Sequence, residues 1–184
     1  TRDLKKIKNC NIFIVTVPTP ITKSNKPDLK HLINATKTLS TILKKNDLII
    51  YESTVYPGCV ENICANIIEK NTVLKLNTDF FLGYSPERIS PGEKQKNLKN
   101  IFKIFSGSNQ NITNFVDKLY QTIIKTTYKC SSIRVAEAAK VIENTQRDLN
   151  IAFVNELAKI FEKLNLNTHE VIKAASTKWN FIRF

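Results

Sequence analysis

Three short polar segments follow apolar runs in this sequence and could bring reactive side chains together. They are Pro18-Thr19-Pro20, Glu52-Ser53-Thr54 and Pro86-Glu87-Arg88. Carboxylate, hydroxyl and guanidinium groups of this kind can move protons or bind a polar ligand. Turn chemistry alone explains any one segment, because Pro, Ser and Thr end strands in many proteins. Three such segments in a row, one of which joins Glu to Arg, favour a site.

A second polar group lies in an apolar stretch nearer the C-terminus. Lys140 and Asn144 are four residues apart, so they share one face of a helix. The alternative is a solvated helix face with ordinary ion pairs. Because apolar residues occupy most sides of this helix, a lysine and an asparagine on its inner face would need partners there.

The first two thirds of the chain alternate strand-like and helical segments. We expect strands over 11–17, 47–51, 79–84 and 102–106, and helices over 29–43, 59–69 and 111–124. This alternation is typical of an α/β protein with a parallel sheet. Ligands of such a sheet bind beyond the carboxyl ends of its strands, where the three polar segments fall.

The last third of the chain changes character. From Ser132 to about Leu164 the sequence contains neither Gly nor Pro, and apolar residues occur on nearly every helical face. We expect one long helix, buried on most sides for much of its length. A helix of ~30 residues is about 45 Å long, so it would link two domains or form a subunit interface. A further helix is expected to begin at Asn167 or Thr168 and to run through Ala175.

The composition is that of an ordinary globular protein, with 42% hydrophobic and 24% charged residues. A net charge of +12 favours a polyanionic partner, but the lysines are spread along the chain and not gathered into an arm, so we do not expect nucleic-acid binding. The four cysteines form no metal-binding spacing, and no apolar run is long enough for a membrane span. We therefore expect a cytoplasmic protein without a metal site or a membrane anchor.

Five motifs together resemble one enzyme family. They are Thr16 to Pro20 (TVPTP), Tyr51 to Gly58 (YESTVYPG), Gly83 to Gly92 (GYSPERISPG), Ala136 to Asn150 (AEAAKVIENTQRDLN) and Thr177 to Phe181 (TKWNF). In this order they resemble the UDP-glucose/UDP-mannose dehydrogenase family, and most closely its UDP-N-acetylhexosamine 6-dehydrogenase branch. The resemblance covers essentially the whole chain.

That family oxidises the C6 alcohol of a UDP-sugar to a carboxylate with two NAD+, and a cysteine holds the intermediate as a thiohemiacetal and then a thioester. The resemblance implies that Glu87 assists hydrolysis of the thioester. It implies that Lys140 and Asn144 stabilise oxyanionic intermediates, and that Thr54 holds a catalytic water. The product would be an aminouronic acid for surface polysaccharide.

The resemblance also implies binding roles. Residues expected at the nicotinamide half of NAD are Pro18, Thr19, Glu52, Ser53 and Thr54. Residues expected at the UDP-N-acetylhexosamine are Glu87, Arg88, Ile89, Ser90, Lys140 and Asn144. The implied fold is the C-terminal half of a Rossmann-like parallel sheet over residues 1–129. Residues 130–184 would form a long connecting helix and the start of an all-α central dimerisation domain, so a homodimer or a complex with the missing parts is expected.

The sequence also departs from the family. Its four glycines do not form the G-x-G-x-x-G loop that binds the NAD pyrophosphate. The family's nucleophilic cysteine lies downstream of the TKWNF motif, and none of Cys10, Cys59, Cys64 and Cys130 has that position. The UDP-binding domain is missing as well. We therefore expect a central fragment that is inactive alone. The alternative is a non-catalytic remnant of a split or decaying gene that acts at most as a dimerising piece.

A common origin in one active site has a geometric consequence. Thr54, Glu87, Lys140 and Asn144 should place their side chains within roughly 10 Å of one point, since catalytic contacts are close to ~3 Å and a bound substrate spans the rest. The solvated-face alternative predicts that Lys140 points to solvent, and that Glu87 pairs only with a neighbouring Lys or Arg. Coordinates with Lys140 in solvent, away from Glu87 and Thr54, would rule out the site.

Overall fold

The computed structural model describes residues 3–89 and 99–182. The strands are β1 (Ile12–Val15), β2 (Asp47–Tyr51), β3 (Phe80–Tyr84), β4 (Phe102–Gly107) and β5 (Thr126–Lys129). The helical elements are η1 (Leu4–Ile7), α1 (Lys30–Ser40), η2 (Val60–Ala65), α2 (Asn66–Asn71), α3 (Gln110–Gln121), α4 (Ile133–Lys163) and α5 (Thr168–Ala175). The chain forms two compact units, residues 1–141 and residues 142–184, and α4 belongs to both.

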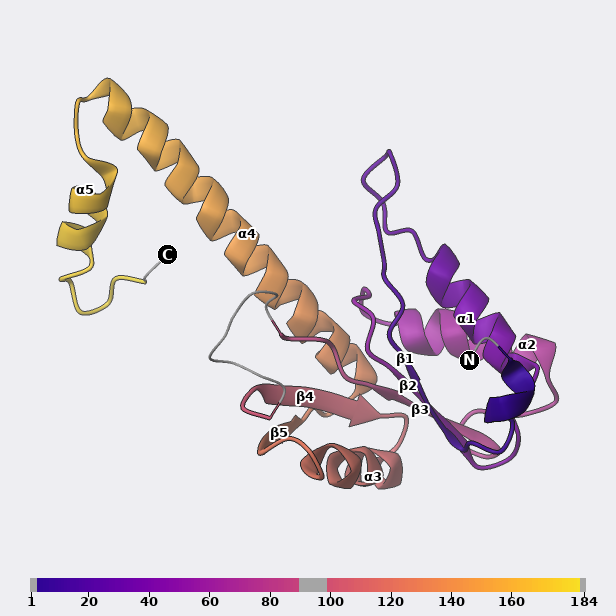
Figure 1. Ribbon diagram of the computed structural model, residues 1–184. Coiled ribbons are helices and arrows are strands. Elements are labelled where there is room, and N and C mark those ends of the chain that lie inside the picture. The colour runs from indigo at the N-terminus through magenta and orange to yellow at the C-terminus, as the bar shows by residue number, and fades with distance from the viewer. Residues whose placement is uncertain (1–2, 90–98, 183–184) are drawn as a thin grey trace. The chain divides into compact units, whose positions relative to one another are not determined.

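The first unit is built on a five-stranded sheet with the order β1-β2-β3-β4-β5 (Figure 1). The pairs β1–β2, β2–β3 and β4–β5 are parallel, which confirms the α/β, Rossmann-like fold class. The pair β3–β4 is antiparallel, so the expectation of a parallel sheet is wrong at this one position. Among the described residues no helix lies between β3 and β4, and a parallel connection requires a crossover that is usually helical.

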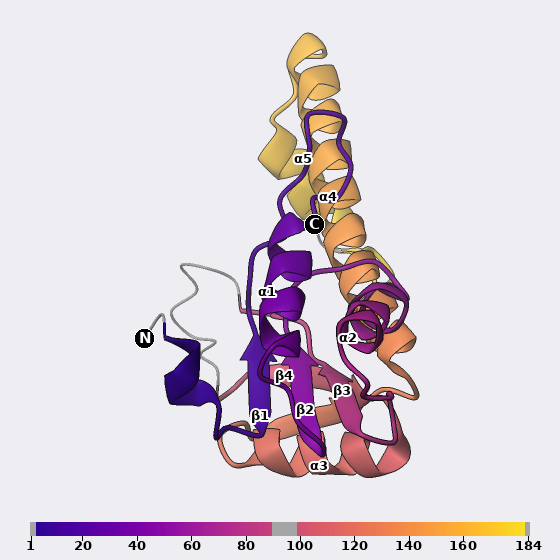
Figure 2. The same ribbon diagram turned by 90° about the vertical axis from the view of Figure 1, so that its right-hand side faces the viewer.

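Helices cover both faces of the sheet. The connections from β1 to β2 and from β2 to β3 advance in the same direction, so right-handed crossovers place α1 and α2 on one face, in front of β1–β3 in Figure 2. The pair β4–β5 runs the opposite way, and the same handedness therefore places α3 on the other face. The side chains of β2 alternate accordingly: Ile49 and Tyr51 pack in the core under α1 and α2, while Leu48 and Ile50 pack in the core on α3.

Element boundaries differ from the expected ones where local patterns are weak. The expected helix over 59–69 begins as the π-helix η2 and continues as α2. Strand β5 was not predicted, because it is a largely exposed edge strand whose residues show no apolar alternation. The start of α5 is confirmed, since the Asn167 side chain accepts hydrogen bonds from the N–H groups of His169 and Glu170.

Helix α4 has the expected length, but the prediction that it is buried on most sides is wrong for this chain. Only Ile133, Ala136 and Glu137 are buried along its 31 residues. The apolar residues exposed on its second half are Ile142, Leu149, Ile151, Phe153 and Ile160. The reason is that, among the described residues of the second unit, α5 is the one further helix that could pack against it. Among the described residues no helix has the length and the apolar character needed to cross a membrane.

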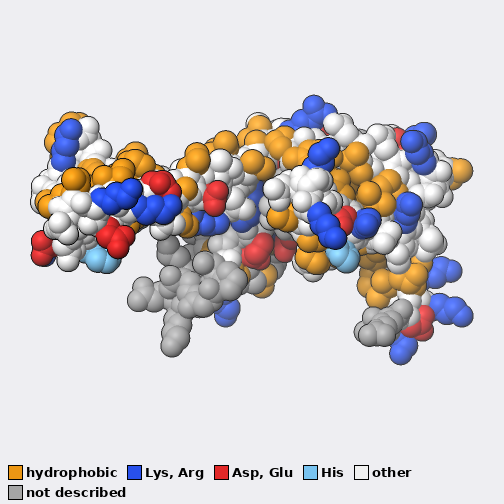
Figure 3. All heavy atoms as spheres, turned by 90° about the horizontal axis from the view of Figure 1, so that it is seen from above, with side chains coloured by type: hydrophobic (Ala, Val, Ile, Leu, Met, Phe, Trp, Pro, Cys, Tyr) orange, Lys and Arg blue, Asp and Glu red, His pale blue; other side chains and the backbone are white. Residues whose placement is uncertain are grey.

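Charged residues are dispersed on the one face of the molecule that Figure 3 shows. On the face seen in Figure 3, Lys and Arg side chains are scattered among apolar and uncharged ones and form no continuous stripe. This distribution matches the even spread of lysine along the sequence.

The turn from β4 into α3 depends on Gly107. A Cβ atom at this position would lie 2.6 Å from the backbone nitrogen of Thr113 and 2.8 Å from the carbonyl carbon of Ile112. We expect Gly107→Ala to lower the free energy of unfolding by about 1–3 kcal/mol, because backbone atoms must move to admit the methyl group. Urea unfolding of the purified chain measures this. Gly83→Ala is the matched control, since its Cβ would meet a side chain, Ile50 Cγ1, at 3.2 Å. Equal losses for the two variants would contradict the prediction.

Candidate functional site

The carboxyl ends of β1, β2 and β3 line one cavity of about 420 Å³. Its walls are formed by Thr16, Val17, Pro18, Thr19, Glu52, Ser53, Thr54 and Glu87. The parallel ladder continues past the strands, because the N–H of Glu52 donates to the carbonyl of Val15 at 2.9 Å and the N–H of Ser85 donates to that of Tyr51 at 3.0 Å. The polar segments that follow the three strands therefore meet at one edge of the sheet.

Three hydroxyl-bearing side chains at this edge differ in their hydrogen bonds and exposure. The Ser53 hydroxyl donates to the carbonyl of Val17 at 2.6 Å, and this bond joins the segment after β2 to the segment after β1. The Thr19 hydroxyl oxygen is buried and has no hydrogen-bond partner within the described part of the chain. Thr54 is exposed. An unpaired hydroxyl in the wall of a cavity of this size fits a site for a polar ligand such as the nicotinamide half of NAD.

Glu87 is held by its own backbone. Its carboxylate Oε1 accepts hydrogen bonds from the N–H of Arg88, at 2.7 Å, and from the N–H of Ile89. The Arg88 guanidinium donates to the carbonyl of Phe102 at 2.6 Å, which fixes this segment on the first residue of β4. Ser90, which we expected at the nucleotide sugar, lies outside the described residues.

Lys140 reaches the same segment from helix α4. Its Nζ donates a hydrogen bond to the main-chain carbonyl oxygen of Glu87, and the side chain is half-buried. The alternative that placed Lys140 in solvent, away from Glu87, is therefore wrong. Asn144 belongs to the second unit, where its side-chain oxygen accepts a hydrogen bond from Arg147 at 2.9 Å. Its place near Glu87 stays a prediction.

Behind the cavity lies a charged cluster that the sequence analysis missed, formed by Glu52, Lys103 and Tyr120. The Tyr120 hydroxyl donates to Glu52 Oε1, and Lys103 Nζ lies 3.2 Å from the same oxygen. Lys103 is 1% exposed, and its ammonium lies 4.9 Å from the centre of the Tyr120 ring. Glu52 thus lines the cavity while one of its oxygens is bound from inside the protein.

The environment of this cluster keeps Tyr120 protonated. Burial, and then the negative charge of Glu52, raise the pKa of the Tyr120 hydroxyl well above its usual value. The raised pKa favours the protonated hydroxyl, which donates to Glu52. A signal for the cluster was present in the sequence, since Lys103 stands between Phe102 and Ile104 in an apolar strand.

None of the four cysteines lines the cavity at this edge, where a nucleophile would have to lie. Cys59, the N-cap residue of η2, and Cys64, within η2, are fully buried in the core. A hydrogen bond with Cys64, together with burial, raises the pKa of the Cys59 thiol, which disfavours the reactive thiolate. Cys10 is exposed on the segment before β1, and Cys130 is buried in the core.

The ion pair of Lys103 with Glu52 can be tested by unfolding. We expect Lys103→Met to lower the free energy of unfolding by about 3–5 kcal/mol, because it leaves a carboxylate without its buried cation. The double variant with Glu52→Gln should lose less than the sum of the single variants. Lys159→Met is the control. It removes an exposed pair with Glu156 and should cost less than about 1 kcal/mol. Additive losses in the double variant would contradict the buried pair.

Comparisons with known proteins agree with this architecture. Residues 1–124 match the NAD binding domain of the UDP-glucose/GDP-mannose dehydrogenase family, and residues 134–184 match its central domain. The name of the family pairs mannose with GDP, which corrects that detail of the resemblance. The relatives include UDP-N-acetyl-D-glucosamine 6-dehydrogenases of Salmonella typhi, 56% identical, and of Pseudomonas aeruginosa, 55% identical, each over 100% of this chain and 44% of the relative.

A solved structure shows the same fold. The UDP-D-ManNAc dehydrogenase of Pyrococcus horikoshii superposes with a TM-score of 0.92 at 33% identity, over 100% of this chain and 44% of that chain. The chain thus spans less than half the length of the proteins that it matches. Both of the matched domains occur in the expected order, and the matches extend over nearly all of its residues. The chain therefore belongs to the UDP-glucose/GDP-mannose dehydrogenase family.

Proposed function

We propose that this chain supplies part of the cofactor and substrate site of an NAD-dependent UDP-N-acetylhexosamine 6-dehydrogenase. The observation that carries the proposal is the cavity at the ends of β1, β2 and β3, where Lys140 is bonded to the carbonyl of Glu87. The 6-dehydrogenases named above, which match the whole chain, support a UDP-N-acetylhexosamine as the substrate. The reaction would serve surface polysaccharide synthesis in the cytoplasm.

NAD, when bound, accepts a hydride from the substrate carbon. In the proposal, Pro18, Thr19 and the segment Glu52 to Thr54 form the wall on which the nicotinamide rests. The buried Thr19 hydroxyl would pair with a polar group of the cofactor, and Thr54 would hold a water at the mouth of the cavity. The cation Lys103 neutralises Glu52 from behind, so this wall carries little net charge.

The substrate side of the proposal rests on the segment from Glu87 to Ser90. Arg88, Ile89 and Ser90 would contact the nucleotide sugar. Lys140 would stabilise negative charge that develops on the substrate oxygen, with Asn144 as a hydrogen-bond donor.

The purified chain alone should not reduce NAD with UDP-N-acetylglucosamine or UDP-N-acetylgalactosamine. Its glycines form no G-x-G-x-x-G loop, and none of its cysteines lies at the described edge of the sheet. A chimera tests the roles directly: the chain replaces the aligned region of the Salmonella typhi relative, and NADH absorbance follows turnover. We expect an active chimera, in which Lys140→Met lowers kcat by about 100- to 1000-fold.

A second variant of the chimera serves as the control. Lys159→Met changes a lysine on the same helix that pairs with exposed Glu156, and it should leave kcat within about twofold. A chimera that folds and binds NAD but does not oxidise either sugar would contradict the proposed substrate class. Unchanged kcat in Lys140→Met would contradict the proposed role of that lysine.

We also propose that the protein forms a homodimer through α4. Ile142, Leu149, Phe153 and Ile160 are exposed and recur after seven, four and seven residues, so they form one apolar stripe on the helix. A second copy of the same stripe would cover it with matching apolar side chains.

Sedimentation velocity of the chain tests the dimer. We expect a dimer or larger species for the parent chain, and a shift to monomer in the double variant Leu149→Gln/Ile160→Gln. Ile151→Gln is the matched control, because Ile151 is also exposed but lies on the opposite side of the helix from Ile142. A parent chain that sediments as a monomer, or a control that dissociates as far as the double variant, would contradict the assignment.

A further inference from the structure

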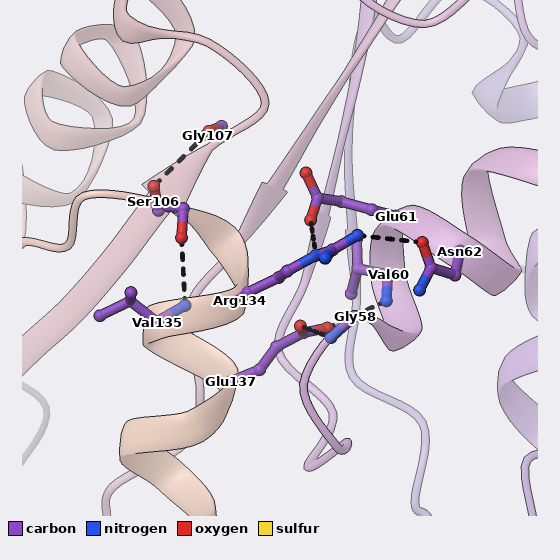
Figure 4. A network of polar contacts seen from close by, with 10 residues as sticks. Gly58, Val60, Glu61, Asn62, Ser106, Gly107, Arg134, Val135 and Glu137 are labelled. Atoms are coloured by element: carbon purple, nitrogen blue, oxygen red, sulfur yellow. Dashed lines mark hydrogen bonds and ion pairs between the residues drawn. The ribbon is translucent and has the colours of Figure 1, made fainter.

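One buried carboxylate of the first unit is used by none of the roles above. Glu137 is 0% exposed and lies on the first turns of α4. Its Oε1 accepts a hydrogen bond from the N–H of Val60 at 2.9 Å, and its Oε2 accepts one from the N–H of Gly58 (Figure 4). Both oxygens are therefore occupied by backbone donors that lie more than seventy residues away in the sequence.

These donors belong to the start of the π-helix η2. The first N–H groups of a helix have no partner within the helix, and no side chain of the η2 N-cap residue, Cys59, satisfies them. Glu137 supplies the missing acceptor from another element. Gly58 has a φ of +87°, and a Cβ there would lie 2.9 Å from Asn62 Nδ2, so this backbone geometry favours glycine.

The carboxylate joins two pieces of the proposed site. Gly58 ends the segment that begins at Glu52 and carries Thr54. Lys140 follows Glu137 by three residues on the same face of α4, where it donates to the carbonyl of Glu87. A shift of this turn of α4 relative to Gly58 would therefore change the position of Lys140 relative to Thr54.

The Glu137 carboxylate is buried at a cost that its two hydrogen bonds offset. Burial raises the pKa of the Glu137 carboxyl, although the N–H groups of Val60 and Gly58 act in the opposite direction. An apolar side chain here would avoid that cost but would leave the N–H groups of Gly58 and Val60 without this acceptor. What the carboxylate provides is a fixed geometry, since two oxygens meeting two N–H groups define both distance and orientation.

We infer that Glu137 is a positioning residue that locks the Thr54 segment to the turn of α4 that carries Lys140. The functional meaning of this lock rests on the proposed dehydrogenase site, but the lock itself is a property of this chain. A second contact, on the surface, joins the same elements: Arg134 donates to Glu61 at 3.0 Å and to Asn62 at 3.2 Å (Figure 4). Arg134 is exposed and provides a matched control, because exposed pairs contribute little.

The test uses isotope-labelled chain without cofactor or substrate. Hydrogen exchange reports on the amides of Gly58 and Val60, and the nitrogen-15 signal of the Lys140 ammonium reports on its bond to Glu87. In Glu137→Gln one oxygen becomes an NH2 group that faces an N–H donor. We expect both amides to exchange at least about tenfold faster, and the Lys140 ammonium signal to broaden or vanish. Arg134→Gln should leave both readouts unchanged.

The Lys140 readout separates positioning from local capping. Faster amides with an unchanged Lys140 signal would show that Glu137 caps η2 only, and would overturn the inference. Unprotected amides in the parent chain, or equal effects of Arg134→Gln, would overturn it as well. If Glu137→Gln does not fold, Glu137→Asp is tested by the same two measurements. This variant keeps the carboxylate but moves it back by one methylene group. Because neither measurement requires turnover, failure of the lock is distinct from failure of the proposed enzyme, which the chimera tests.

Discussion

The parallel alignment of β1, β2 and β3 is the constraint on which the rest of the first unit depends. Because the three strands run the same way, their carboxyl ends meet at one edge, and the polar segments that follow them line one cavity. β2 is buried along its whole length, with side chains in both cores. Because β2 lies between two helical layers, the segment from Glu52 to Thr54 that follows it must lie at this edge.

Two of the buried charged side chains lie near that edge, whereas Asp47 and Asp117 are buried at other places in the first unit. Lys103 and Glu137 are fully buried, and each meets partners from a different element: Lys103 meets Glu52, and Glu137 meets the backbone of Gly58 and Val60. Burying an ion is unfavourable unless its partners are well placed. Both groups contact the segment from Glu52 to Val60, which lines the cavity at its start.

Helix α4 contributes to two features of the molecule, the proposed site and an exposed apolar stripe. Its first turns belong to the sheet domain, where Ile133 and Ala136 complete the core and Lys140 reaches Glu87. Its later turns expose a stripe of apolar side chains, which is unusual for a monomer that is complete by itself. One helix thus contributes both to the proposed site and to the surface through which we propose that two copies associate.

Hydrophobic periodicity and turn residues are local signals, so the fold class, the strands β1 to β4 and the three polar segments at the strand ends could be predicted from the sequence. It also singled out Lys140 and Asn144, as polar residues that share one face of a helix rich in apolar residues. The direction of β4, the edge strand β5 and the exposure of α4 could not be predicted in this way, since each depends on neighbours that are distant in sequence. For the same reason the partners of Lys103 and Glu137 could not be predicted: 51 residues separate Lys103 from Glu52, and 79 separate Glu137 from Gly58.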